Sequence, residues 1–105
     1  MHGLVLTLAG FRGEHRTHAQ ELVQAAGALR EDDFAPQVTT HLVCAFGDAA
    51  SRKQRAAKVR AANEWNDNCF GMGRKVWVVR LSWLESCVRT WGRAPEAAHP
   101  LGEDG

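Results

Sequence analysis

The residues with the clearest chemical potential are five cations in one short stretch: Arg52, Lys53, Arg55, Lys58 and Arg60. Ser51, followed three residues later by Gln54, matches a capping box, which predicts a helix that begins at Ser51. The first turn of a helix carries a partial positive charge, so cations there are mildly unfavourable unless an anion lies nearby. The pattern indicates either an anion site or a solvated basic face.

The charge of the chain is unevenly distributed, although the net charge is only +1. Residues 1–50 carry three cations and six acids, and residues 51–93 carry ten cations and three acids. Residues 94–105 carry three acids and no cation. The middle of the chain therefore forms a basic surface on a nearly neutral molecule.

Enzymatic motifs are not found. A cysteine phosphatase needs C-x5-R, but seven residues separate Cys44 from Arg52, and four separate Cys69 from Arg74. The sequence contains neither a G-x4-G-K-[ST] phosphate loop nor a G-x-S-x-G elbow. His41 has no spaced acid and nucleophile, and we interpret it as a structural residue at the start of a strand. The sequence predicts no enzyme.

Length and composition predict one globular domain. The chain has 105 residues, of which 45% are hydrophobic, enough to bury a core. We expect no membrane span and no secretory signal. Cys44, Cys69 and Cys87 lie far apart, which predicts no metal site, no disulfide and a reducing compartment. We expect Cys44 and Cys87 to be small core residues.

Apolar runs and helical spacing alternate along the chain. Strands are predicted at 3–11, weakly at 28–31, at 41–46 and at 75–80; helices are predicted at 16–28, from 51 to 63 or 65, and at 82–91. Gly27 fits the end of the first helix. An irregular loop is expected at 66–74.

The last predicted helix carries the strongest core signal. Ser82 is expected to cap it, with Glu85 three residues later. Trp83, Cys87 and Trp91 recur every fourth residue along one face. We interpret Trp83 and Trp91 as core anchors.

This order of elements predicts an α/β domain with a mainly parallel sheet. Ligands of such sheets gather at the carboxyl ends of the strands, beside helix N-termini. The first strand should end there at Ala9, Gly10 and Phe11, and the third at Phe46 and Gly47. The cationic helix should start at the same edge.

Several segments together resemble the BRCT domain, a module of DNA-damage-response proteins. They are "LAGF", Gly27–Ala28, "TTHLVCA" and "VWVVRLSWLESC", with Trp83 and Cys87 as the most characteristic pair. The resemblance implies a four-stranded parallel sheet flanked by three helices in residues 1–93, followed by a tail, 94–105. "LAGF" with Arg16 five residues later, and "THLVCAF" followed by a Lys, are similar to the central BRCT of the X-ray-repair scaffold protein of single-strand-break repair.

The resemblance also implies a phosphate site. Phosphate-binding relatives use a hydroxyl at the end of the first strand, the N–H of the following Gly, and a Lys of the second helix. Here these positions correspond to Ala9, Gly10 and Lys53, with Lys58 as the alternative lysine. Lys53 is preferred because it lies in the predicted first turn. Thr7 lies on the same face as Ala9 but about 6–7 Å away.

The missing hydroxyl weakens such a site without removing its cations. One hydrogen bond to a charged group is worth about 1.5–3 kcal/mol. By the resemblance, Arg16 takes the place of a pocket arginine, and Arg52 and Arg55 add charge. Guanidinium groups favour bidentate phosphate contacts, so this set suits a polyanion better than one phosphoserine.

Two functions follow as expectations. The first is a nuclear DNA-repair module that binds poly(ADP-ribose), DNA ends or a phosphoprotein through Gly10, Arg16, Lys53 and Arg52. The second is a protein–protein module that dimerises or docks a partner through a helix face. Neither requires a cofactor or a metal. Trp83, Cys87 and Gly27 are expected to be structural in both.

Overall fold

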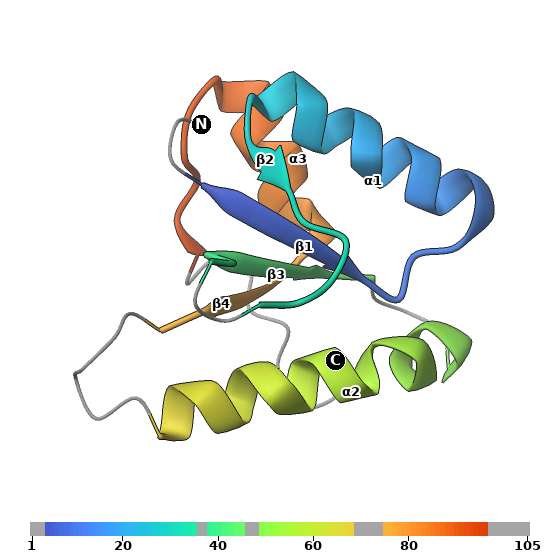
Figure 1. The fold of residues 1–105 in the computed structure, drawn as a ribbon. Coiled ribbons are helices and arrows are strands. Elements are labelled where there is room, and N and C mark those ends of the chain that lie inside the picture. The colour runs from blue at the N-terminus through green and yellow to red at the C-terminus, as the bar shows by residue number, and fades with distance from the viewer. Residues whose placement is uncertain (1–3, 36–37, 46–48, 69–74, 97–105) are drawn as a thin grey trace.

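The computed structural model describes residues 4–35, 38–45, 49–68 and 75–96. Strands and helices alternate along it: β1 (Val5–Ala9), α1 (Gly13–Ala26), β2 (Leu29–Arg30), β3 (His41–Cys44), α2 (Ala49–Asp67), β4 (Trp77–Arg80) and α3 (Leu81–Thr90). The four strands form one parallel sheet in the order β2-β1-β3-β4. Figure 1 shows α1 and α3 on one face of this sheet and α2 on the other. The predicted fold is confirmed.

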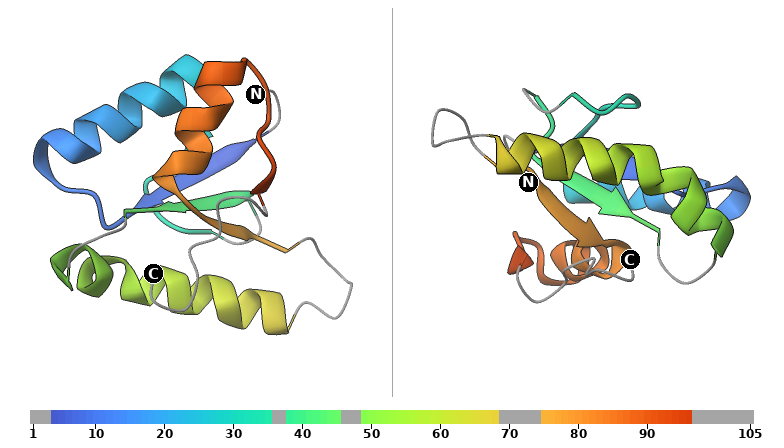
Figure 2. Two further views of the ribbon diagram at one scale, coloured as in Figure 1. Left: turned by 180° about the vertical axis from the view of Figure 1, so that it is seen from behind. Right: turned by 90° about the horizontal axis from the view of Figure 1, so that it is seen from below.

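Alternation along the strands divides the core into two clusters. Leu6 and Val43 face α1 and α3, where they pack with Trp83. Ala9 and Cys44 belong to the second cluster, which faces α2 and includes Leu42, Ala62 and Val76. Successive residues of a strand point to opposite faces, so one short strand supplies both clusters. The two views of Figure 2 show the helix layers on both sides of the sheet.

The residues after α3 pack back against the domain. Trp83 Nε1 donates to the carbonyl of Ala94 at 2.9 Å, and the amide of Ala94 lies 3.2 Å from Cys87 Sγ. Glu96 Oε2 lies 2.9 Å from Nε2 of the buried His41. The domain boundary was expected after residue 93. Because these contacts continue through Glu96, we propose that the domain extends at least that far.

Helix boundaries differ from prediction mainly at the N-termini. The first helix begins at Gly13, with Arg12 as N-cap, and not at Arg16. It ends as predicted, because Gly27 takes a left-handed conformation (φ 75°) and its amide bonds back to the helix. The expected cap at Ser82 is wrong, since α3 already begins at Leu81 and its N-cap is Arg80.

The cationic helix is longer than expected at both ends. It begins at Ala49, so Ser51 lies inside its first turn and is not the N-cap. It continues to Asp67, which makes two residues of the expected loop helical. The side-chain amide of Asn66 donates to the carbonyl of Val76 and accepts from its backbone N–H. These two bonds tie the end of α2 to the segment before β4. Cys69, Phe46 and Gly47 lie outside the described residues.

The aromatic stripe of the last helix separates into a buried and an exposed part. Trp83 is fully buried and Cys87 nearly so, as predicted. Trp91 is 90% exposed, so its interpretation as a core anchor is wrong. It follows the last helical residue and adopts a left-handed conformation (φ 57°), which turns its side chain out of the helical register. In the part of the chain that the structure describes, no helix is both long and apolar enough to cross a bilayer.

Candidate functional site

A small polar pocket lies at the carboxyl end of β1, beside the N-terminal half of α2. Its volume is about 110 Å³. It is lined by Leu8, Gly10, Phe11, Arg16, Gln20, Arg30, Glu31, Asp32, Gln54 and Lys58. These residues come from β1, α1, β2 and α2 and the adjoining loops, so the fold assembles the pocket from segments that are distant in sequence. It lies at the sheet edge where a ligand was expected.

Gly10 lines this pocket at the turn that follows β1. The strand ends at Ala9, whose carbonyl still accepts from the amide of Ala45 at 2.8 Å. Gly10 then takes φ 83°, a left-handed conformation that a side chain disfavours. The turn carries the chain away from the sheet and into α1. The left-handed backbone conformation therefore explains why a glycine stands at position 10.

Lys58 reaches the pocket across the sheet edge. Its Nζ donates to the carbonyl oxygens of Leu8 at 3.2 Å and Asp32 at 3.4 Å. An ammonium group has three N–H donors, so one remains for a ligand after these bonds. Lys58 shares a helix face with the fully buried Ala62, four residues on, and this places its stem against the sheet.

Arg16 and Arg30 are joined through Gln20. With its amide oxygen turned toward both guanidinium groups, Gln20 accepts from Arg16 Nε at 3.2 Å and from Arg30 Nη1. This shared acceptor holds two forked donors on one wall of the pocket. Guanidinium groups so placed suit the oxygens of a phosphoryl group.

The residues that follow Arg30 add two acids, Glu31 and Asp32, to the lining. Asp32 Oδ1 lies 3.7 Å from Arg30 Nε, beyond normal hydrogen-bond distance, and its side chain is 70% exposed. Glu31, also exposed, has no ion-pair partner among the described residues. The lining thus combines three cations with two carboxylates, which leaves a net charge of about +1.

The structure brings together only part of the expected set. Gly10 and Arg16 line one pocket, together with the alternative lysine, Lys58. Lys53 and Arg52 are exposed on α2 and do not line it. The preference for Lys53 rested on a helix start at Ser51. Because α2 begins two residues earlier and turns Lys58 toward the sheet, the geometry favours Lys58.

Arg55 was expected to add charge to the phosphate site, but it does not line the pocket and bonds the protein's own backbone instead. It is 2% exposed, and its Nη1 donates to the carbonyl of Ala45 beyond the end of β3. Ala9, at the expected hydroxyl position, is buried in the cluster that faces α2. The Thr7 hydroxyl already shares a hydrogen bond of 2.9 Å with the Thr39 hydroxyl. Thr7 therefore does not supply the ligand hydroxyl that Ala9 lacks.

Sequence reasoning missed the wall formed by Gln20, Arg30, Glu31 and Asp32. These residues stand on the outer face of α1 and around β2, which has only two residues and gives almost no periodic signal. Their placement depends on the pairing of Leu6 with Arg30. The Lys-x-x-x-Ala spacing did not single out Lys58, because Lys53 has the same spacing to Ala57; only the structure shows that Ala62 is buried and Ala57 exposed.

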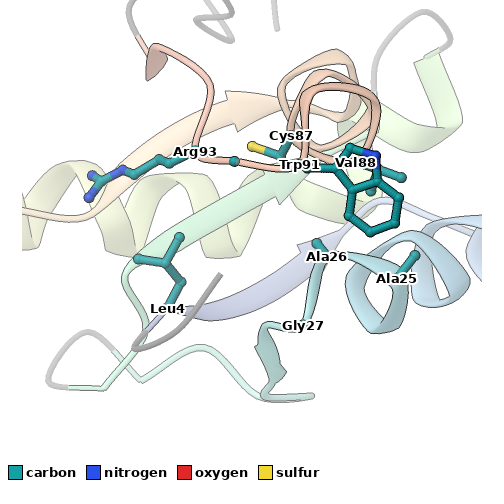
Figure 3. Close-up of a pocket in the computed structure, with 9 residues that line it drawn as sticks. Leu4, Ala25, Ala26, Gly27, Cys87, Val88, Trp91 and Arg93 are labelled. Atoms are coloured by element: carbon teal, nitrogen blue, oxygen red, sulfur yellow. The ribbon is translucent and has the colours of Figure 1, made fainter.

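A second, larger concavity lies between α1 and α3. Its volume is about 430 Å³, and its lining includes Leu4, Ala26, Val88 and the exposed Trp91. Figure 3 shows the Trp91 indole beside Val88, over the C-terminal end of α1. Trp91 is a bulky side chain held in a left-handed conformation, which costs about 1–2 kcal/mol. An exposed and strained tryptophan beside a groove is suited to contact a partner.

The described thiols are poor nucleophiles. Burial raises the pKa of Cys44 to about 12, although Arg55 and Lys58 lower it. Burial also raises the pKa of Cys87, against the hydrogen bond from Ala94. Thiolate is the reactive form, so neither residue is suited to covalent chemistry near neutral pH. In the described ranges, His, Cys, Asp and Glu do not gather into a group that could hold a metal.

Comparison with known proteins identifies the family. The family model for a twin BRCT domain matches residues 4–70. The solution structure of the first BRCT domain of the DNA-repair protein XRCC1 is 25% identical, with a TM-score of 0.65 over 98% of this chain and 67% of that one. The crystal structure of S. pombe Rad4 BRCT3,4 is 24% identical, with a TM-score of 0.72 over 95% of this chain and 48% of that one.

Further solved structures share the fold. The second XRCC1 BRCT domain is 20% identical, with a TM-score of 0.67 over 95% of this chain and 87% of that one. The search of curated proteins finds no match. The first, second and C-terminal BRCT domains of XRCC1 all match, so the expected resemblance to the X-ray-repair scaffold protein is confirmed, without singling out its central BRCT. The chain belongs to the BRCT domain family.

Proposed function

We propose that this chain is a non-catalytic binding module of a nuclear DNA-repair protein and that it holds a phosphate-bearing ligand in the pocket at the end of β1. One observation carries the proposal: Gly10 just after β1, Arg16 of α1 and Lys58 of α2 line one polar pocket. Poly(ADP-ribose), DNA ends and a phosphoprotein are the candidate ligands. Their shared phosphoryl group matches the donors.

Each of the three residues has a separate part in the proposed site. The backbone N–H of Gly10 and the remaining proton of Lys58 donate to one phosphoryl group. Arg16, positioned by Gln20, adds a forked contact to the same group. The buried Ala9 supplies no hydroxyl, so the affinity rests on charge and falls as salt rises.

The test is a binding panel of poly(ADP-ribose), nicked DNA and a phosphoserine peptide at two salt concentrations. Lys58→Ala should weaken phosphate-dependent binding roughly tenfold, the effect of losing one charged hydrogen bond. The matched Lys53→Ala variant should change it less than about threefold. Because Arg16 and Lys58 share one ligand, the effects of Arg16→Ala and Lys58→Ala should be non-additive. Equal small losses for Lys58 and for the exposed cations Arg52, Lys53 and Arg60 would indicate a diffuse basic face and contradict the pocket.

A protein–protein docking role is the second candidate, and the exposed Trp91 beside the α1–α3 groove favours it. Solved structures of yeast Rtt107, which share this fold, include complexes with Mms22 and Slx4. If the groove is the working site, Trp91→Ala should abolish dimerisation or partner binding and leave phosphate binding unchanged. Sedimentation across a concentration series measures the dimer directly.

A further inference from the structure

The pocket at the end of β1 is lined by side chains of both charges. Arg16, Arg30 and Lys58 supply its cations, and Glu31 and Asp32, which follow Arg30 directly in the chain, supply its carboxylates. The two kinds of group lie close together, because Lys58 Nζ donates to the backbone carbonyl of Asp32 at 3.4 Å. A ligand that enters the pocket therefore meets both cations and carboxylates.

The carboxylates of Glu31 and Asp32 make at most one weak ion pair among the described residues. Asp32 Oδ1 lies 3.7 Å from Arg30 Nε, and the two side chains are 70% and 38% exposed. Such an exposed pair contributes little. In the described part of the chain Glu31 has no ion-pair partner. Both acids can therefore accept a cation from outside.

These charges discriminate between the candidate ligands. Poly(ADP-ribose) and DNA carry only negative charge, so any phosphate beyond the first that approaches this loop is repelled. A phosphorylated peptide with a basic residue close by places its phosphate on Gly10, Arg16 and Lys58 and its cation on the carboxylates. At physiological salt the Debye length is about 8 Å, so neighbouring charges of this lining still interact with a bound ligand.

We propose, on the basis of the function proposed above, that the preferred ligand is a phosphoserine or phosphothreonine peptide with Lys or Arg within a few residues of the phosphorylated side chain. Glu31 and Asp32 receive that basic residue. They thereby select a protein partner over a polyanion at the same site.

Three peptides of equal length test this proposal, each with one phosphoserine that is flanked on both sides by Arg, Ala or Glu. Calorimetry at about 0.15 M salt gives each dissociation constant. The wild-type protein should bind the Arg peptide roughly three- to tenfold more tightly than the Glu peptide, the effect of one or two partly exposed charge pairs. In the Glu31→Gln/Asp32→Asn variant this ratio should fall below about twofold.

A matched variant controls for total charge. Glu64→Gln/Asp67→Asn makes the same change in net charge near the far end of α2, where Glu64 lies about 9 Å along the helix axis from Lys58. It should leave the ratio unchanged. If it lowers the ratio equally, the preference reflects net charge and the inference is overturned.

The remaining outcomes separate the inference from the function on which it rests. Phosphate-dependent binding that needs Lys58 but ignores the flanking residues overturns the inference and leaves the proposed function intact. Poly(ADP-ribose) that binds more tightly than every peptide has the same consequence. If no phosphorylated peptide binds better than its unphosphorylated form, and poly(ADP-ribose) and nicked DNA do not bind, the proposed function fails as well.

Discussion

The imidazole of His41 stacks on the indole of Trp83, with the ring centroids 4.4 Å apart and the planes 14° from parallel. Both rings are fully buried, and both also hold the chain by hydrogen bonds. His41 Nδ1 lies 2.8 Å from Thr40 Oγ1, and its Nε2 contacts Glu96. The pair thus ties β3 to α3 and to the segment after α3.

Truncation of Trp83 should strongly destabilise the domain. Trp83→Ala removes the stack on His41 and the bond to Ala94, and it leaves a large cavity, so we expect a loss of about 3–5 kcal/mol in the free energy of unfolding. Urea denaturation followed by circular dichroism measures it. Trp91→Ala is the matched control, and its side chain is 90% exposed, so its effect should stay within about 0.5 kcal/mol. Similar losses for both variants would contradict the assigned core.

Acid should weaken the contact between Glu96 and His41. Burial raises the pKa of Glu96, but hydrogen bonds from His41, its own backbone and Arg93 outweigh it and hold the pKa below the ordinary value of 4.5. A lowered folded-state pKa stabilises the fold above the ordinary value, and that stabilisation is lost as pH falls through the folded-state pKa.

The corresponding measurement compares the wild-type protein with Glu96→Gln from about pH 6 to about pH 3. The wild-type protein should be the more stable at pH 6, and the difference in the free energy of unfolding should shrink toward pH 3. A difference that stays constant over this range would show that the Glu96 carboxylate does not contribute through its charge.

The two described cysteines should resist modification in the folded protein. With a pKa of about 12, Cys44 is a thiolate in only about one molecule in ten thousand at pH 8. Cys87 is 2% exposed. A Cys69→Ser variant leaves these two thiols, which should react slowly with a disulfide reagent until urea is added. Rapid labelling of either thiol without denaturant would contradict their burial.

The fold was predictable because its signals are local and consistent. Apolar runs mark β1, β3 and β4, and Gly27 marks the end of α1. The helix starts were harder, since Ser51 and Ser82 both fit a capping pattern and neither is the N-cap. A capping box is one preference among several, and packing of the whole helix against the sheet decides where it begins.

The candidate site was predictable only in part. Gly10 and Arg16 follow directly from the family pattern around the first strand. The choice between Lys53 and Lys58 depends on the rotation of α2, which the burial of Ala62 fixes and local sequence does not. Trp91 kept the spacing of a core residue, but the helix ends just before it and its left-handed backbone turns it outward. Tertiary context decided both positions.

The most direct test of the account follows the backbone amides by nuclear magnetic resonance while a phosphoserine peptide is added. The amide signal of Gly10 should shift most, with those of Arg16 and Lys58 close behind, and the unphosphorylated peptide should produce no such change. Lys58→Ala should reduce the Gly10 shift at equal peptide concentration. Shifts that centre on Trp91 and the α1–α3 groove, with Gly10 unmoved, would contradict the phosphate pocket and favour docking through the helix face.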